Sequence, residues 1–320
     1  MESRFLKENN PFSTPDFSGK YTPRNLYDPV KYILDQPGKK IRYQLTLLGC
    51  KLFSDNNQNA LDAATAIEIF HNFTLVHDDV MDNADTRRGL DSIHKKWDIN
   101  TAILSGDVML ILAYEYLLKC PQESLQAVLS NFSKTGREVC EGQQLDMDFE
   151  SLPSVQMDSY LEMIRKKTAV LLGSALYIGA KCGGASEKDA GHLYEFGVDL
   201  GIAFQIRDDI LDCYGDKKKV GKLKGGDILQ GKKTILYIRA WNCLPPEDQA
   251  IFEQLYNSQS ETKVNDVMEW FHKCDVKSYA LDMEKKLFRK AINSLKKVET
   301  SNENTRELFD FAHDLMDRDH

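Results

Sequence analysis

The stretch His71 to Gly89, HNFTLVHDDVMDNADTRRG, decides the fold and the chemistry of this chain. It carries a DDxxD pattern followed by two arginines: Asp78, Asp79, Asp82, Arg87 and Arg88. A second DDxxD occurs much later in the chain: Asp208, Asp209 and Asp212. Each acidic motif has cationic residues just downstream. This arrangement indicates a polyanion that is held through bridging metal ions.

Helical geometry explains the spacing inside each motif. Residues i and i+4 share one face of an α-helix, so Asp78 and Asp82 project together. Their like charges cost a few tenths of a kcal/mol in water. Mg²⁺ offsets this repulsion, because it takes oxygen ligands from one or two carboxylates, from waters and from substrate phosphates. The alternative is a solvated acidic helix face, but the apolar residues before both motifs favour a functional site.

The downstream cations fit a phosphate site. Arginine grips phosphate with a planar fork, and lysine acts as a mobile point charge. Five lysines crowd the region after the second motif: Lys217, Lys218, Lys219, Lys222 and Lys224. Most lysines of this kind belong to a solvated loop. Lys222, and Lys232 further along, are the two that we expect to bind substrate.

Composition places the chain among globular proteins. Of its 320 residues, 42% are hydrophobic and 28% are charged. The net charge of −8 argues against nucleic-acid binding, which needs a basic surface. The N-terminus lacks the apolar segment of a signal peptide, and the longest apolar run, 169–180, is too short for a transmembrane segment. The seven scattered cysteines form no CxxC motif, which favours reduced thiols and a cytoplasmic location.

The apolar pattern is helical. Residues 1–29 contain four of the nine prolines and predict an irregular N-terminal arm. The proline-free stretches 38–120 and 154–244 can hold long helices. Apolar residues recur at helical spacing over 61–76 and 104–116, and no alternating pattern predicts a strand. We therefore expect an all-α protein with a single domain over residues 1–320.

The sequence resembles the trans-prenyl diphosphate synthases of the polyprenyl synthetase family, of the short-chain geranylgeranyl or farnesyl type. The landmarks stand in family order: GKKIR at 38–42, HNFTLVHDDVMD at 71–82, RRG at 87–89, GDVML at 106–110, GQQLD at 142–146, KT at 167–168, FQIRDDILD at 204–212 and GKLKGGDILQGKKT at 221–234. The resemblance implies an isoprenoid-synthase-type helical bundle around a central cavity. The two aspartate motifs would face each other across it, and the protein would be a homodimer.

The resemblance also implies roles for single residues. The principal Mg²⁺ ligands, for three ions, would be Asp78, Asp82 and Asp208, supported by Asp79, Asp209 and Asp212. The diphosphate of the allylic substrate would be held by Arg87, Lys167 and Lys232, with Lys222 closing over it. Isopentenyl diphosphate would bind without metal to Gly38, Lys39, Arg42, His71 and Arg88. Thr168 and Gln205 would direct oxygen dipoles at the developing allylic cation. For His71, a packed core histidine is the alternative.

The implied reaction is the Mg²⁺-dependent head-to-tail condensation of isopentenyl diphosphate with an allylic diphosphate. Counting back from Asp78 along a helix places Thr74, Phe73 and Phe70 where the growing product would extend. The bulk of Phe73 disfavours long products and indicates C20 geranylgeranyl diphosphate, with C15 farnesyl diphosphate close behind. Two alternatives share the fold: a terpene cyclase, and a non-catalytic subunit of a heteromeric synthase. The complete second motif and the cations assigned to isopentenyl diphosphate argue against both.

Overall fold

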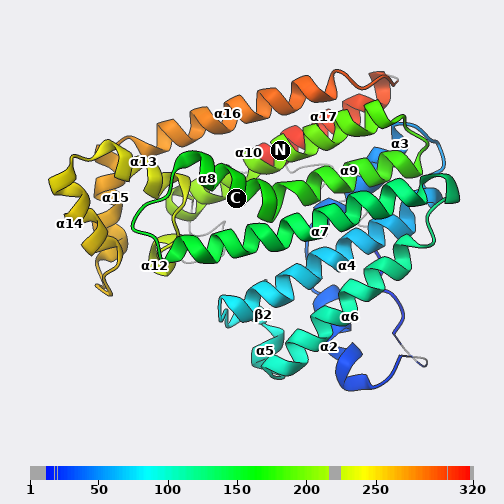
Figure 1. Cartoon of the computed structure of the whole chain (residues 1–320), viewed down its shortest axis with the longest axis horizontal. Coiled ribbons are helices and arrows are strands. Elements are labelled where there is room, and N and C mark those ends of the chain that lie inside the picture. Colours follow the sequence, from blue (N-terminus) through cyan, green and yellow to red (C-terminus); the bar gives the residue numbers. More distant parts are fainter. Residues whose placement is uncertain (1–11, 18, 20, 216–224, 301, 318–320) are drawn as a thin grey trace. The chain divides into compact units, whose positions relative to one another are not determined.

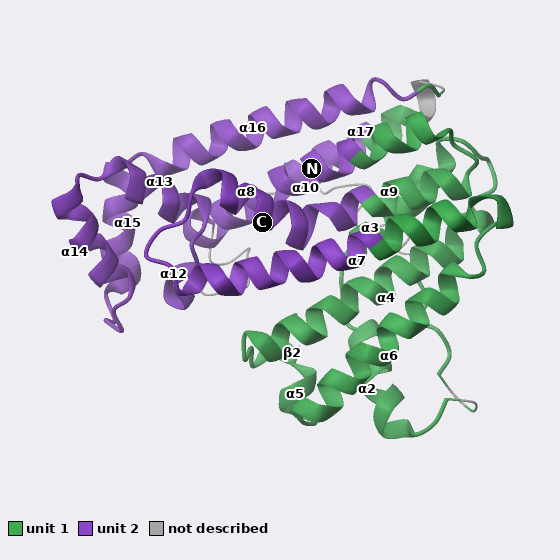
Figure 2. Cartoon of the chain, viewed as in Figure 1, with its two compact units in different colours: residues 1–133, 174–194, 299–308 green, residues 134–173, 195–298, 309–320 purple. Residues whose placement is uncertain are grey.

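The computed structural model describes residues 12–17, 19, 21–215, 225–300 and 302–317. The regular secondary structure of these residues is helical apart from one short hairpin (Figure 1). The prediction of an all-α protein is therefore confirmed. The chain divides into two compact units, coloured separately in Figure 2. Unit 1 contains residues 1–133, 174–194 and 299–308; unit 2 contains residues 134–173, 195–298 and 309–320. The organisation as a single domain stays a prediction.

Unit 1 is built around one long helix that carries the first aspartate motif. Its elements are α2 (Arg24–Leu34), α3 (Ile41–Lys51), α4 (Gln58–Met81), β1 (Thr86–Arg87), β2 (Leu90–Asp91), α5 (Ile93–Lys96) and α6 (Ile99–Leu117). The N-terminal half of α4 buries small residues, among them Ala60, Ala63 and Ala64. Small side chains let neighbouring helices approach closely, and α3 and α6 pack against α4. The helices predicted over 61–76 and 104–116 are therefore confirmed.

The irregular arm is shorter than the sequence suggested. Helix α2 begins at Arg24, so the prediction of an irregular segment up to residue 29 is wrong for its last residues. Pro29 lies inside this helix, where it removes one backbone hydrogen bond. Burial of Val30, Ile33 and Leu34 on one face offsets that loss, because each of these side chains is almost fully removed from water.

A two-stranded ribbon follows α4, although no alternating apolar pattern predicted a strand. Strands β1 and β2 pair antiparallel, with Arg87 opposite Leu90. Arg88 and Gly89 form the connecting turn with φ angles of 55° and 77°. Two successive positive φ values define a type I′ turn, the type that matches the twist of a hairpin. Asn-Gly is the usual sequence for this turn, so Arg-Gly did not predict it.

Unit 2 holds the second aspartate motif and most of the C-terminal helices. Its own elements are α8 (Met157–Ile164), the π-helix η1 (Arg165–Ala169), α12 (Gly226–Gln230), α13 (Ile235–Cys243), α14 (Pro246–Tyr256), α15 (Lys263–Lys273) and α16 (Val276–Leu295). Four helices contribute residues to both units: α7 (Gln122–Glu150), α9 (Val170–Cys182), α10 (Glu187–Tyr214) and α17 (Asn302–Met316). The apolar run 169–180 is buried throughout. Along the described residues, no helix combines the length and hydropathy that crossing a bilayer requires.

Helix α6 exposes large apolar side chains. Leu104 and Ile111 are each 57% exposed, and Leu118, which follows the end of the helix, is 60% exposed. The buried side of the helix is formed instead by Met109, Leu112 and other residues. The sequence pattern had assigned Leu104 and Ile111 to the apolar repeat of this helix. The helix is confirmed, but part of that repeat faces away from the core of unit 1.

Candidate active site

The first aspartate motif lies at the C-terminal end of α4. The backbone N–H of Asp82 donates to the carbonyl of Asp78 at 2.8 Å, so these residues stand one helical turn apart. Both are partly exposed. Their carboxylates therefore project from the same side of the helix, which is the arrangement predicted for a shared divalent cation.

Asp79 plays a different part from its two neighbours. It is buried, and Arg87 donates to its Oδ1 through Nε at 2.9 Å and also through Nη2. Burial raises the pKa of Asp79, and the hydrogen bond and charge of Arg87 oppose that rise. Arg87 Nη2 also lies 3.6 Å from Asp78 Oδ2. Asp79 is therefore the aspartate that accepts hydrogen bonds from the arginine that the hairpin supplies, while Asp78 makes a longer ion pair with it.

The hairpin turn brings Arg88 against the loop before α3. A Cβ atom added to Gly38 would lie 3.2 Å from the guanidinium carbon of Arg88, so Gly38 leaves room for this side chain. Arg88 Nη1 is buried without a hydrogen-bond partner among the described residues. Burial lowers the pKa of Arg88 and the nearby Glu68 charge opposes this. A buried, unpaired guanidinium N–H is costly in isolation, and it suits a site whose anion completes the pairing.

Arg42 and His71 meet in the same region. Arg42 Nη1 lies 3.1 Å from His71 Nε2. A guanidinium can only donate, so Nε2 accepts and the imidazole carries its proton on Nδ1. Burial, and then the charges of Arg42 and Arg88, hold the pKa of His71 well below its usual range. His71 is therefore a neutral ring among cations, and its Nε2 atom accepts a hydrogen bond from Arg42.

Lys40 is a residue of this region that the sequence did not single out. Lys39 is exposed, whereas Lys40 is buried in the left-handed region at φ 46°. Its ammonium lies 3.4 Å from Glu68 Oε1 and donates to the carbonyl of Leu34 at 3.3 Å. The signal was a lone acid, Glu68, on an apolar stretch, since buried charges are normally paired. The pair fixes the start of α3, which presents Arg42.

The second motif, on α10, contains one exposed and one buried aspartate side by side. Asp208 is exposed. Asp209 is buried and accepts hydrogen bonds from Tyr160 at 2.6 Å and from Gln205 Nε2 at 3.2 Å. Burial, the charge of Asp227 and that of Asp208 raise the pKa of Asp209 to about 8, against the two donors. Of the two, Asp208 is the carboxylate open to a metal ion.

Asp227 is a second residue that the sequence analysis missed. Its backbone N–H donates to Asp212 Oδ2 at 3.1 Å, and Gly225 N–H donates to the Asp212 carbonyl at 2.8 Å. Gly225 has a φ of 77°, which favours glycine. The turn therefore places Asp227 beside the last aspartate of the motif. An acid between the glycines of GKLKGGDILQGKKT was the available signal.

Lys167 and Thr168 lie in η1, a π-helix of the kind that recurs at functional sites. Lys167 Nζ pairs with Asp146 of α7, and the Thr168 hydroxyl donates to Gln205 Oε1 at 3.2 Å. A Cβ at Gly142 would lie 2.2 Å from the backbone N of Lys167, closer than any side chain allows. The glycine of the GQQLD landmark thus permits α7 to pass directly over the segment that presents Lys167.

The backbone at Lys232 is fixed by two hydrogen bonds. Tyr256 donates to the Lys232 carbonyl at 2.6 Å, and Lys232 N–H donates to the Asp227 carbonyl at 3.0 Å. The next residue, Lys233, is buried with its ammonium 4.2 Å from the ring centre of Tyr237. This segment leaves Lys232 partly exposed. Lys222 lies outside the described residues.

The residues predicted to limit product length belong to an aromatic cluster in unit 1. Phe73 lies 5.4 Å from Phe70 and 4.8 Å from His77, measured between ring centres. Phe70 also packs at 5.0 Å against Phe132 of α7, which the sequence analysis did not single out. Phe70 is fully buried, while Phe73 keeps 8% of its surface exposed. Thr74 donates through its hydroxyl to the His71 carbonyl at 2.7 Å.

The acidic residues fit Mg²⁺ by their chemistry. Within the described ranges, no three acidic, histidine or cysteine side chains form a ready-made metal cage. Mg²⁺ does not require one, because it usually keeps several waters and takes one or two carboxylates plus substrate phosphates. The pair Asp78 and Asp82 supplies hard oxygen ligands of this kind.

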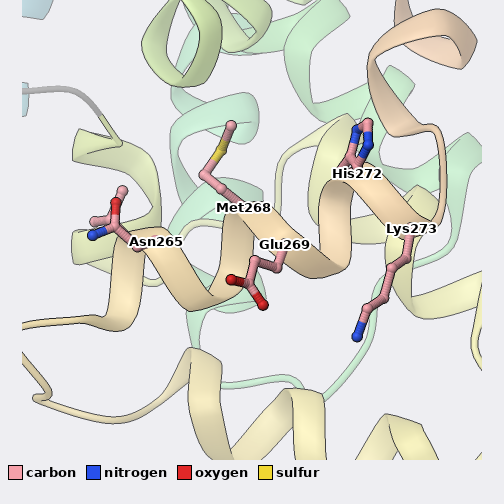
Figure 3. A pocket seen from close by; sticks show the side chains of 6 residues that line it. Asn265, Met268, Glu269, His272 and Lys273 are labelled. Atoms are coloured by element: carbon pink, nitrogen blue, oxygen red, sulfur yellow. The ribbon is translucent and has the colours of Figure 1, made fainter.

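A pocket of about 500 Å³ lies elsewhere, along α15 (Figure 3). Its lining includes Asn265, Met268, Glu269, His272 and Lys273. None of the predicted site residues contributes to it. The candidate site is therefore defined by its side chains, not by this pocket.

Fold and site together define an all-helical protein with two aspartate-rich motifs and cation clusters suited to polyanions. The family model for polyprenyl synthetases matches residues 23–274. The chain belongs to the polyprenyl synthetase family.

Three relatives of this chain are named as prenyl diphosphate synthases. A geranylgeranyl diphosphate synthase of Methanosarcina mazei is 43% identical over 221 residues, 68% of each chain. A geranylgeranyl pyrophosphate synthase of Geoglobus acetivorans is 37% identical over 303 residues, 93% of this chain and 92% of its own. A geranylfarnesyl diphosphate synthase of Natronomonas pharaonis is 37% identical over 236 residues, covering 68% of this chain and 69% of its own.

Solved structures give the same picture. A geranylgeranyl pyrophosphate synthase is 40% identical with a TM-score of 0.88, covering 94% of both chains. The synthetase of Pyrococcus horikoshii Ot3 is 31% identical with a TM-score of 0.87, covering 98% of this chain and 93% of its own. The geranylgeranyl pyrophosphate synthase of Corynebacterium glutamicum, 26% identical over 92% of this chain and 90% of its own with a TM-score of 0.83, was solved with isoprenyl diphosphate and magnesium.

Proposed function

We propose that this protein is a short-chain trans-prenyl diphosphate synthase. It condenses isopentenyl diphosphate head-to-tail with an allylic diphosphate in a Mg²⁺-dependent prenyl transfer. The observation that carries the proposal is the first site: a same-face aspartate pair at the end of α4, and in the hairpin that follows, a guanidinium whose buried Nη1 has no hydrogen-bond partner among the described residues. That combination binds anions both through metal and directly. The names of the relatives support the same activity.

The carboxylates that would chiefly hold the metal are not buried. Asp78 and Asp82 would hold Mg²⁺ at the first motif, and Asp208 would hold it at the second, with Asp212 and the buried Asp209 in support. Three Mg²⁺ ions per site are our assignment, and their charge would stabilise the departing diphosphate. Asp79 supports the metal indirectly, because its carboxylate is occupied in holding Arg87.

The two diphosphates are bound by different residues. Isopentenyl diphosphate binds without metal to Gly38, Lys39, Arg42, His71 and Arg88. Neutral His71 orients the Arg42 fork, and Gly38 leaves space at Arg88. The allylic diphosphate is assigned to Arg87, Lys167 and Lys232. Lys222 is expected to add a further cation.

The reaction needs charge stabilisation and no protein nucleophile. The allylic carbon–oxygen bond breaks, and diphosphate leaves with the electron pair. The double bond of isopentenyl diphosphate then bonds to the allylic carbon, and the proton lost from the adduct passes to the released diphosphate. Thr168 and Gln205 direct oxygen dipoles at the allylic cation. Such dipoles are most effective when they are fixed before the reaction in a water-poor site.

The product we propose is C20 geranylgeranyl diphosphate, with C15 as the alternative length. The aromatic cluster of Phe70, Phe73 and Phe132 lies N-terminal to the motif on α4 and beside it on α7. Its bulk would stop a growing chain. Phe73 is the member with exposed surface, which makes it the candidate for contact with the product.

A terpene cyclase and a non-catalytic subunit are the competing functions. A cyclase has no use for cations that bind isopentenyl diphosphate, whereas Arg42 and Arg88 are both held in place here. A non-catalytic subunit would not need two complete aspartate motifs. Both observations favour the synthase.

The proposed activity is tested by incubating purified protein with isopentenyl diphosphate, Mg²⁺ and a C5, C10 or C15 allylic primer in turn. We expect a C20 product from at least one primer and none after chelation of the metal. Chromatography of the dephosphorylated products gives the chain length. Absence of condensation with every primer would refute the synthase. A cyclic hydrocarbon formed without isopentenyl diphosphate would identify a cyclase.

We further propose that the protein is a homodimer that covers the exposed face of α6. Leu104 and Ile111 stand seven residues apart on this helix, about two turns, and both are 57% exposed. Exposed apolar side chains that share a helix face suit a protein–protein interface. Burying one such side chain stabilises an interface by about 1.5–3 kcal/mol. Replacing both residues by lysine is therefore expected to weaken dimerisation by at least about a hundredfold.

Sedimentation velocity measures this change. The control is Ile251→Lys on α14, where an isoleucine is 55% exposed on another helix. The control should sediment as the wild-type dimer does. A double variant of α6 that remains dimeric at micromolar concentration would place the interface elsewhere.

A further inference from the structure

Tyr160 is a buried residue of unit 2 that the proposed reaction does not yet use. It lies on α8 with only 1% of its surface exposed. Its hydroxyl donates to Asp209 Oδ2 at 2.6 Å. A buried tyrosine hydroxyl always requires a partner, but this one is paired with an aspartate of the second motif. The pairing connects α8 to the residues assigned to the allylic cation.

Asp209 fixes the orientation of the next side chain. Its second oxygen, Oδ1, accepts a hydrogen bond from Gln205 Nε2 at 3.2 Å. The group of Gln205 that faces this carboxyl oxygen is thus the amide nitrogen, which acts as the donor. The amide oxygen is thereby turned to the opposite side. With Tyr160 on Oδ2 and Gln205 on Oδ1, both oxygens of Asp209 are occupied by donors.

The orientation of Gln205 in turn determines the direction in which the Thr168 hydroxyl group points its proton. Gln205 Oε1 accepts the hydroxyl proton of Thr168 at 3.2 Å. A threonine hydroxyl has a single proton and two lone pairs. With the proton directed at Gln205, only lone pairs remain for any other partner. Thr168 then offers the negative end of its dipole, which is what a carbocation requires.

We propose that Tyr160 is a positioning residue that sets the polarity of Thr168 through Asp209 and Gln205. The inference rests on the proposed synthase function and adds to it. Without the tyrosine donor, Asp209 loses one of its two fixed contacts and Gln205 can turn its amide over. Thr168 would then donate its proton elsewhere, and its lone pairs would no longer face the cation. The groups that Tyr160→Phe would reorient, Gln205 and Thr168, are assigned neither to a phosphate nor to a metal ion, so diphosphate binding should change little.

The test is a double-mutant cycle between Tyr160→Phe and Thr168→Val. Phenylalanine keeps the ring and removes only the donor. We expect Tyr160→Phe to lower kcat by about tenfold while the KM values for both diphosphates stay within about twofold. In the Thr168→Val background the same replacement should change kcat by less than about twofold, because the hydroxyl it acts on is absent.

The matched control is Tyr177→Phe, which also removes a tyrosine hydroxyl from a carboxylate, here Glu187 at 2.8 Å on unit 1. Its kcat should equal that of the wild type. A loss that is equally large in both Thr168 backgrounds, or a rise in KM alone, would overturn the proposal. If Tyr160→Phe does not fold, Asp209→Asn is compared in the two backgrounds, since asparagine allows the turned-over amide. Because Asp209 also supports the metal ion, only the part of the kcat loss that disappears in the Thr168→Val background counts for the proposal. Wild-type protein without condensation activity refutes the synthase instead.

Discussion

Replacing Asp78 by asparagine is expected to lower kcat/KM for condensation by about a thousandfold, a typical loss when one electrostatic group of a catalytic site is removed. Asparagine keeps the shape of the side chain and removes its charge. Asp78 is partly exposed and stands one turn from Asp82, so it is the carboxylate best placed to hold a cation. The Mg²⁺ concentration that gives half-maximal activity should rise as well.

Steady-state kinetics over a Mg²⁺ series measure both effects. Asp62→Asn is the matched control, because Asp62 lies on the same helix and pairs with Lys119 at 3.5 Å, away from the motif. It should retain wild-type kinetics. If the kcat/KM of Asp78→Asn falls by less than about tenfold, the carboxylate of Asp78 is not a ligand of the catalytic metal ion.

Asp79→Asn should disturb Arg87 more than the metal ion, because the carboxylate of Asp79 holds Arg87. This difference between neighbouring aspartates could not be predicted from the sequence. The spacing of DDxxD predicted a shared face for Asp78 and Asp82, and the helical backbone supports it. It could not show that Asp79 turns inward to hold Arg87, because the hairpin that brings Arg87 back has no usual turn sequence. The roles within one motif thus depend on a turn that local sequence did not predict.

The same distinction holds for the fold. Apolar periodicity predicted α4 and α6, because helices of this length bury a regular stripe. It could not say which apolar side of α6 faces the core, since Leu104 and Leu112 are equally hydrophobic. Nor could it predict η1 or the need for Gly142, because close approach between distant backbones leaves no periodic signal. Family landmarks indicated the candidate site residues, but neither Lys40 nor Asp227 was among them.

We expect the product length to depend on the aromatic cluster of unit 1, whose phenylalanines differ in how deeply they are buried. Phe70 is fully buried between Phe73 and Phe132, so its loss would chiefly destabilise the helix packing. Phe73 lies five residues before Asp78, about 7.5 Å along the helix axis at the usual rise per residue. It retains exposed surface and packs against His77 on one side. Phe73 is therefore the residue at which bulk can be removed with the least damage to the core.

Phe73→Ala is expected to extend the product beyond that of the wild type, to C25 or longer, because the space vacated by the ring lies where the prenyl tail would grow. The same change should lower the free energy of unfolding by about 3 kcal/mol, as for other buried phenylalanines. Chromatography of products from one fixed primer measures the first effect and thermal unfolding the second. Phe73→Tyr keeps the bulk and should keep the wild-type product. An unchanged chain length in a folded Phe73→Ala protein would move the limit to another residue, and Phe132 on α7 would be the next position to shorten, since its ring already packs against Phe70.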